Sequence, residues 1–250
     1  GTNTAAICCG GNPPPTGTGV TETWNGTSWT EVADLNTVRE ELSQGMGTYN
    51  DFVTAGGNNG SYLANTEFWN GTSWTEVADL NTSREKLAGA GVNNTSALAF
   101  GGYLNTAVTE SWNGTSWTEV NDLNEGAGNS SGAGTQTAAF MVYNTQHEQW
   151  DGTNWTELAE LNTARTVLAS VGITTSVLSF GGENPAGSAR LANTEFWNGS
   201  SWTEVADLGT AVYFNSGAGT SSLALSFTSD PGSGATTQTE EWTVPSSLSN

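Results

Sequence analysis

A six-residue phrase, Trp-Asn-Gly-Thr-Ser-Trp or a close variant, occurs five times in this chain and constrains its fold more than any other feature. The copies span 24–29, 69–74, 112–117, 150–155 and 197–202, and Trp242 marks a sixth, degraded copy. Successive first Trp residues are 45, 43, 38, 47 and 45 residues apart, and Glu always stands two positions before them. A period of this length predicts a propeller or a solenoid built from repeated units.

Strand signals decide between these two architectures. In the unit from Arg84 to Leu123, a Gly- and Ala-rich segment (87–92) and an apolar segment (96–100) precede two segments, 107–112 and 117–120, joined by Asn113-Gly114. Asn-Gly is a strong signal for a hairpin turn, and no segment shows a capped helical period. Four short antiparallel strands per unit are typical of a propeller blade.

Small residues alternate in the first strand of most units. Gly suits the crowded strands near the axis of a ring, whereas a phosphate-binding loop would need a third Gly and a following helix. We therefore interpret the pairs as structural. They are Gly45 and Gly47, Gly89 and Gly91, Gly132 and Gly134, Ser170 and Gly172, and Gly217 and Gly219.

Arg84, the Gly101-Gly102 doublet, the Asn113-Gly114 turn and Trp117 together resemble the kelch motif. The diglycine recurs at 10–11, 56–57 and 181–182. Unit four has Tyr143-Asn144 in its place, unit six has Thr228-Ser229, and the motif Arg is missing near Gly126 and Val212. The motif's usual Tyr on the third strand is mostly absent.

We therefore predict an all-β chain forming one domain over 1–250, a six-bladed kelch-like β-propeller with incomplete terminal blades. A five-bladed ring is the alternative. The repeat units are approximately 1–36, 37–81, 82–124, 125–162, 163–209 and 210–250. We expect three strands in the first unit, whose inner strand is missing before Thr4, and three in the last, where Pro245–Asn250 takes the place of a fourth.

Composition limits the function. Leu, Ile, Val and Phe make up fewer than one residue in five and the formal net charge is -20, which together suggest disorder. However, 11 Trp and 32 Gly fit a fold with Trp in its core. The negative charge argues against nucleic acid and anionic membranes as partners, and no apolar run is long enough to insert into a membrane. No calcium-binding loop motif occurs, adjacent Cys8 and Cys9 argue against a disulfide framework, and no signal peptide is visible at Gly1.

The sequence offers little for catalysis, and we expect no enzyme activity, cofactor or metal. The single histidine, His147, stands where other units have Thr, so we interpret it as a drifted repeat position. The two Glu residues of each unit recur in successive units, whereas a catalytic pair is normally unique. No acidic cluster outside the repeat is apparent. We expect the Glu beside the first Trp to bond to backbone or to a neighbouring blade.

The Trp residues have two interpretations, stacking on sugars or filling the spaces between blades. Large aromatics at recurring strand positions favour the second, a structural repeat core. These residues are Trp24, Trp29, Trp69, Trp74, Trp112, Trp117, Trp150, Trp155, Trp197, Trp202 and Trp242.

The kelch resemblance implies a ligand face formed by the loops after the second and fourth strands. It suggests an anionic or sugar ligand, since four of the five basic residues fall on this face. The alternative for the motif arginines is pairing with repeat carboxylates. The candidate ligand-binding residues are Arg39, Arg84, Arg165, Arg190, Asn58, Asn59, Tyr62 and Tyr103.

The near-identical copies also resemble kelch-type repeat proteins of marine bacteriophages, usually structural or fibre-like virion proteins. This resemblance implies a non-enzymatic virion or extracellular protein for host attachment or particle decoration. Its partners would be other virion or surface proteins and glycan, and a homo-oligomer is compatible with the sequence. The alternative is a secreted carbohydrate-active enzyme or lectin on the same scaffold. An intracellular adaptor is disfavoured by the charge.

Overall fold

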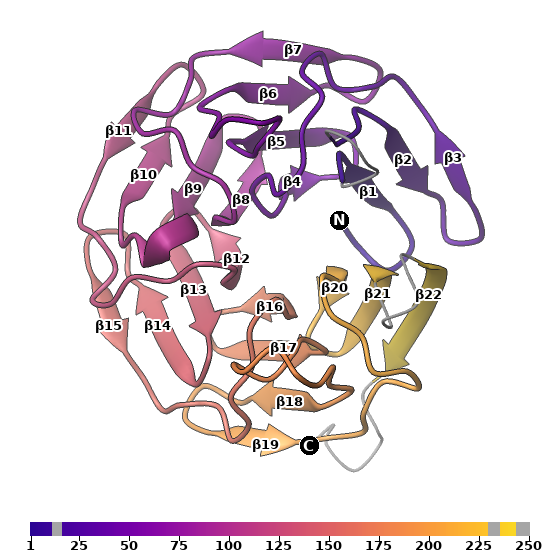
Figure 1. Ribbon diagram of the computed structural model, residues 1–250, viewed down its shortest axis with the longest axis vertical. Helices are drawn as coiled ribbons and strands as arrows, with labels where there is room; N and C mark the ends of the chain where they lie inside the picture. The colour runs from indigo at the N-terminus through magenta and orange to yellow at the C-terminus, as the bar shows by residue number, and fades with distance from the viewer. Residues whose placement is uncertain (12–16, 230–235, 244–250) are drawn as a thin grey trace.

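The computed structural model describes residues 1–11, 17–229 and 236–243, in which 22 strands form six antiparallel sheets. Four sheets have four strands, whereas the first and the last have three. Strands that follow one another in the chain are neighbours in every sheet, so each sheet is a meander. The sheets are arranged around a common axis, with strands such as β4 and β12 innermost and strands such as β7 and β15 at the rim (Figure 1).

The sheets are named blades 1 to 6 in chain order. Blade 1 contains β1 (Ala6–Cys9), β2 (Thr21–Trp24) and β3 (Trp29–Glu31). Blade 2 contains β4 (Met46–Thr48), β5 (Asp51–Ala55), β6 (Thr66–Trp69) and β7 (Trp74–Val77), and blade 3 contains β8 (Ala88–Asn93), β9 (Ser96–Phe100), β10 (Thr109–Trp112) and β11 (Trp117–Glu119). Blade 4 contains β12 (Ser131–Thr135), β13 (Ala138–Tyr143), β14 (Gln146–Trp150) and β15 (Trp155–Glu157). Blade 5 contains β16 (Ala169–Ile173), β17 (Ser176–Phe180), β18 (Thr194–Trp197) and β19 (Trp202–Glu204), and blade 6 contains β20 (Ser216–Thr220), β21 (Leu223–Ser229) and β22 (Thr236–Thr243).

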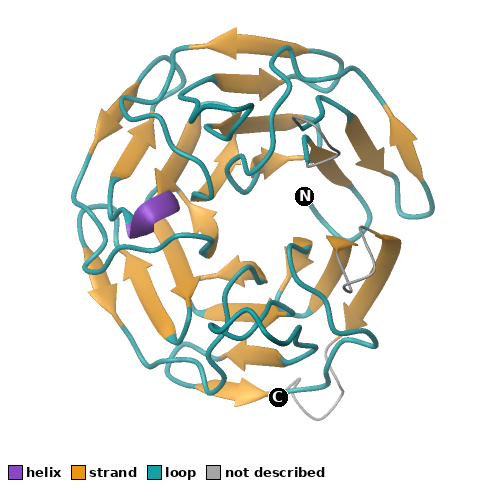
Figure 2. Ribbon diagram, viewed as in Figure 1, coloured by secondary structure: helices purple, strands orange, loops and turns teal. Residues whose placement is uncertain are grey.

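This arrangement confirms a six-bladed β-propeller, and not five blades, and among the described residues the first and last blades have three strands each. The helix η1 (Tyr103–Asn105) is the one helical segment among the described residues, and strands and loops make up the rest (Figure 2). The expected missing strand at Pro245–Asn250 lies outside the described residues.

The Asn-Gly turns form because an Asn side chain caps each hairpin. In blade 3, Oδ1 of Asn113 accepts hydrogen bonds from the backbone N–H groups of Thr115 and Ser116, both at 2.9 Å, and Gly114 has a φ of 89°. Only Gly adopts that backbone conformation without strain. The turn places Trp112 opposite Trp117, with ring centroids 5.3 Å apart.

These Trp pairs fill the spaces between blades. Nine of the eleven Trp side chains are buried, whereas Trp24 and Trp29 of blade 1 are partly exposed. Trp117 of blade 3 packs with Met46, Val53 and Ala97 in one of the hydrophobic clusters of buried residues. Burial of such large aromatic surfaces supplies the hydrophobic stabilisation that the few aliphatic residues do not.

Glycine in the inner strands makes room for aromatic rings. A Cβ atom at Gly132 of β12 would lie 2.4 Å from Cζ of Phe100, which belongs to blade 3. At Gly217 of β20, the same atom would lie 2.9 Å from Cζ of Phe180 in blade 5. The alternating small residues at these positions therefore serve packing, in agreement with their structural interpretation from the sequence.

Blades 1 and 6 meet through side chains. Ala6, Ala218, Leu225 and Phe227 form a buried cluster at this junction, and the Trp29 ring lies 5.0 Å from that of Phe227. The main chain of Gly1 also joins the inner strands: its nitrogen donates to the Gly47 carbonyl and its carbonyl accepts from Gly219 N, both at 3.2 Å. These contacts close the ring without a sheet shared by its two ends.

Candidate functional site

The motif arginines lie inside the blades, each against the repeat Glu of its own blade. Nη2 of Arg39 lies 2.9 Å from Oε1 of Glu67, and both side chains are fully buried. The corresponding distances are 3.0 Å for Arg84 and Glu110 and 3.3 Å for Arg165 and Glu195. Burial lowers the pKa of Arg165 to about 10, and Glu195 opposes this shift, so the guanidinium remains charged at neutral pH.

The diglycine loops explain why an arginine fits there. Nη1 of Arg84 donates to the carbonyl oxygens of Gly101, at 2.8 Å, and Val108, at 2.7 Å. Gly101 has a φ of 70°, a conformation that favours glycine and sets the direction of its carbonyl. The arginine thus joins the ends of the second and third strands to the Glu of the third.

Each of these Glu side chains also holds the end of the preceding repeat unit. The carboxylate of Glu110 accepts hydrogen bonds from the backbone N–H and the side-chain amide of Asn81, at 2.7 and 2.8 Å, and from Thr82 N at 3.3 Å. Glu67, Glu148 and Glu195 make the same contacts in their own blades. The recurring acids are thus structural links along the ring.

Arg39, Arg84 and Arg165 therefore do not belong to the ligand-binding set that the resemblance implied. Their exposed fractions are 0%, 4% and 0%, and each guanidinium is already paired with a repeat Glu. The structure instead shows the alternative given above for these three residues, in which each arginine pairs with a repeat carboxylate. The remaining candidates are Arg190, Asn58, Asn59, Tyr62 and Tyr103.

Tyr62 and Tyr103 come together at the surface, from the loop between β5 and β6 and from η1. Their side chains are 46% and 42% exposed, and the ring centroids lie 5.7 Å apart. Leu104 beside them is 79% exposed. We call Tyr62, Tyr103 and Leu104 the tyrosine patch. Because two aromatic rings and an aliphatic side chain are left in solvent at one place, this patch is a candidate binding surface.

Charged residues surround the tyrosine patch. Nζ of Lys86 lies 5.1 Å from the Tyr103 ring centroid and 3.3 Å from Oε1 of Glu41. Nδ2 of Asn58 donates to Oε2 of Glu85 at 2.6 Å, which holds the loop that carries Tyr62. Asn59 is exposed next to Asn58 in the same loop. Sequence reasoning missed Lys86, Glu41 and Glu85 because no repeated position marks them.

Arg190 belongs to a second surface cluster. Its guanidinium carbon lies 4.4 Å from the ring centroid of Tyr213, which in turn lies 4.6 Å from the ring of Phe214. The loop that carries Arg190 joins β17 to β18, across the ring from the β5–β6 loop (Figure 1). The candidate residues therefore form two separate clusters.

The groups with reactive side chains, His147 and the two cysteines, are buried or partly buried. His147 is 2% exposed, and its ring centroid lies 4.6 Å from that of Trp197 and 5.3 Å from that of Trp202. Cys8 and Cys9 are partly buried and are not joined by a disulfide, and burial raises the pKa of the Cys9 thiol. In the part of the chain that the structure describes, no group of three His, Cys, Asp or Glu side chains is placed to hold a metal ion.

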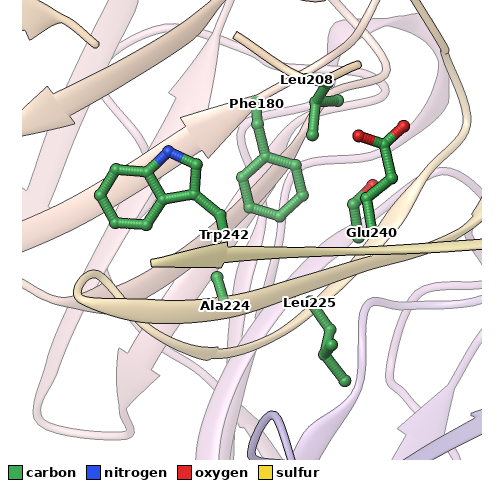
Figure 3. A pocket seen from close by; sticks show the side chains of 7 residues that line it. Phe180, Leu208, Ala224, Leu225, Glu240 and Trp242 are labelled. Carbon is green, nitrogen blue, oxygen red and sulfur yellow. The ribbon is translucent and has the colours of Figure 1, made fainter. Parts of the chain in front are cut away.

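A small apolar cavity lies between blades 5 and 6. Phe180, Leu208 and Trp242 line it, together with the aliphatic part of Glu240, whose carboxylate points away from the Trp242 ring (Figure 3). Its volume is about 10 Å³. That is no more than the space of one water molecule, so this cavity is a packing defect and not a ligand site.

The fold defines the molecule as a six-bladed β-propeller. The solved structure described as "Structure of YjhT" is similar, with a TM-score of 0.74 over 96% of this chain and 94% of that chain. The two sequences are 12% identical, so the similarity shows the fold alone. No protein-family model and no curated protein matches the chain. No helix in the described ranges is long and apolar enough to cross a membrane.

Proposed function

We propose that this chain is a non-enzymatic, kelch-type binding propeller that attaches a virion or an extracellular assembly to surface glycan or protein. The kelch type is supported by the arginine, diglycine and glutamate contacts, which recur in blades 2, 3 and 5. The propeller fold is consistent with a binding or structural role.

The observation that carries the proposal is the tyrosine patch. Residues that repeat from blade to blade lie inside and hold the scaffold, whereas Tyr62, Tyr103 and Leu104 do not repeat and are exposed. Rigid aromatic rings supply large contact area at low entropic cost, and a sugar ring can stack on their faces. Lys86 and Asn58 add hydrogen-bond donors at the edge of the patch.

The acidic surface supports an extracellular setting. A net charge of -20 keeps the protein soluble and repels nucleic acid and anionic lipid. Because they carry the same net charge, neighbouring copies on a particle would repel one another. The acidic surface thus disfavours self-association and leaves the tyrosine patch available for a partner. We infer no cofactor and no metal for this role.

A binding screen tests the proposal. The wild-type protein is applied to a glycan array and to host-cell surfaces, beside the double variant Y62A/Y103A. Tyr49→Ala is the matched control, since Tyr49 is 42% exposed outside the patch. We expect the double variant to lose about tenfold or more in affinity and Y49A to bind as wild type does.

Three outcomes would contradict the proposal. Wild-type binding that the double variant retains would remove the tyrosine patch from the function. Hydrolysis of a bound glycan would favour the alternative, a secreted carbohydrate-active enzyme. Absence of the chain from purified virions and from the culture medium, measured by mass spectrometry, would contradict the proposed location.

A further inference from the structure

Blade 4 lacks the arginine that its neighbours bury. Arg39, Arg84 and Arg165 each stand four residues after a Leu that ends the preceding unit, and Ala127 occupies that position before blade 4. The repeat Glu of this blade, Glu148, is nevertheless 1% exposed, as buried as its counterparts. Blade 4 thus keeps the carboxylate and has lost the cation that pairs with it elsewhere.

A cavity opens where the guanidinium lies in the other blades. In blade 2 the arginine contacts Gly56, Asn65 and Glu67. The residues at these positions in blade 4 are Tyr143, which stands in place of the first Gly of the doublet, and Gln146 and Glu148, four and two residues before the first Trp. All three line a cavity of about 420 Å³, which is within the usual range for small-ligand sites.

A short loop leaves this cavity open to solvent. Only Asn144 and Thr145 connect β13 to β14, whereas residues 56–65, 101–108 and 181–193 make the same connection in blades 2, 3 and 5. Oδ1 of Asn144 is buried and has no hydrogen-bond partner. This orphaned acceptor lies on one of the cavity-lining residues, where a donor from a ligand would satisfy it.

The cavity is strongly acidic. Glu125, Glu157 and Glu160 line it with Glu148, and none of its lining residues is Lys or Arg. Glu125 stands outside the repeat, because the equivalent residues Thr37, Thr82 and Thr163 are neutral. Glu148, Glu157 and Glu160 occupy acidic positions of the repeat, so Glu125 is the one acid of this cavity that the repeat does not explain.

Glu148 accepts hydrogen bonds from neutral groups, but no Lys or Arg side chain among the described residues forms an ion pair with it. Its Oε2 accepts from the backbone N–H and the side-chain amide of Asn124, at 2.9 and 2.8 Å, and its Oε1 accepts from Glu125 N at 3.2 Å. In blade 3 the corresponding Oε1 of Glu110 also accepts from Arg84 at 3.0 Å. Glu157 lies directly across the strand pair and adds a second negative charge.

We propose that this cavity binds a guanidinium group, which takes the place of the missing arginine against Glu148. In blade 3 the guanidinium donates one N–H to the Glu carboxylate and others to two backbone carbonyls, and a planar fork of donors is the cation that matches this arrangement. The carboxylates are not placed to hold a metal ion, so the ligand is an organic cation. It comes either from a free small guanidine or from an arginine side chain of a partner protein.

Titration calorimetry at low ionic strength tests this site. The probes are agmatine, for a free guanidine, and a capped Gly-Arg-Gly peptide, for a protein side chain, with the peptide's neutral citrulline analogue as ligand control. We expect at least one cationic probe to bind and the citrulline peptide not to bind. Glu148→Gln is expected to weaken binding by about tenfold or more, whereas Glu119→Gln, at the position in blade 3 that matches Glu157, leaves it unchanged.

Ala127→Arg is the decisive variant, because it restores the residue that the other blades carry. We expect its own guanidinium to fill the cavity, block both probes and raise the unfolding midpoint. Binding to the peptide alone would assign the guanidinium to a protein partner, and binding of agmatine with equal affinity would assign it to a small molecule.

The proposal fails if neither cationic probe binds to the wild-type protein, if citrulline peptide binds equally well, or if E148Q and A127R bind as wild type does. The site is independent of the proposed attachment function. Tyr62→Ala should leave guanidinium binding intact, and E148Q should leave glycan or cell-surface binding intact, so failure of one proposal is distinguishable from failure of the other.

Discussion

Nε1 of Trp29 donates a hydrogen bond to Oγ1 of Thr239 over 3.3 Å, and this bond joins the first blade to the last. The same Trp-to-Thr bond crosses other blade junctions, at 3.1 Å from Trp74 to Thr21 and at 2.9 Å from Trp117 to Thr66. The junction that closes the ring therefore repeats the contact of the internal junctions, although 210 residues separate its two partners.

Removal of these hydroxyl groups should destabilise the ring in proportion to burial. Thr66→Val leaves the indole N–H of Trp117 buried without an acceptor, and we expect a loss of about 1–2 kcal/mol in the free energy of unfolding. Thr239 is only partly buried, so Thr239→Val should cost about 0.5–1 kcal/mol. Urea unfolding measures both, with exposed Thr72→Val as control. If T66V unfolds at the same urea concentration as T72V, the hydroxyl does not contribute to the junction.

The buried ion pairs lead to a second prediction. Arg84→Met leaves Glu110 charged and without its cation, and loss of one partner of a buried pair costs about 3–5 kcal/mol. We expect the low end of this range, since Asn81 and Thr82 still donate to Glu110. Exposed Arg190→Met should cost less than about 1 kcal/mol, the loss of one surface cation–π contact. Equal denaturation midpoints for the two variants would contradict the structural role of Arg84.

Sequence reasoning succeeded where the same residues repeat. Six recurring Trp and Glu positions predicted six blades, and the Asn-Gly turns predicted the outer hairpins, because these features depend on local geometry and a fixed period. The three strands found in blade 1 also agree with the prediction.

The surface was harder to predict. The position of Arg84 depends on the direction in which the carbonyls of Gly101 and Val108 point, which no residue pattern shows. Two sequence features point to the cavity of blade 4: the short spacing of 38 residues between Trp112 and Trp150, and Ala127 at the position of the motif Arg. That Glu125 and Glu160 meet in this cavity is not visible in the sequence, because they belong to different loops. Contacts between segments far apart in the chain decide such a site.

Glycine in β12 gives a third prediction. A Cβ atom at Gly132 would lie 2.4 Å from Cζ of Phe100 and 2.9 Å from the carbonyl oxygen of Phe140, so the ring or the strand must move. We expect Gly132→Ala to cost about 1–3 kcal/mol, whereas Gly209→Ala meets only the flexible end of the Glu240 side chain and should cost less. In a double-mutant cycle, Phe100→Leu should recover part of the loss. Additive effects of G132A and F100L would rule out this contact as the cause.

The last prediction concerns pH and His147. Burial among Trp197, Trp202 and Phe140 lowers the pKa of this imidazole to about 4, against an ordinary value of 6.5. Below pH 6.5 the unfolded chain therefore binds a proton that the folded chain does not. Neutral His147 therefore makes its full contribution to the free energy of unfolding above pH 6.5. This contribution falls by roughly 3 kcal/mol as the pH is lowered from 6.5 toward 4.

His147→Thr isolates this contribution, because Thr is the residue of the other blades and does not titrate. Carboxylates also titrate near pH 4, but they are common to both proteins. The difference between their free energies of unfolding should thus be constant above pH 7 and change by the His147 contribution between pH 6.5 and 4. A difference that is constant over the whole range would mean that the imidazole is protonated inside the fold, and that water or a rearranged carbonyl reaches it between the two Trp rings.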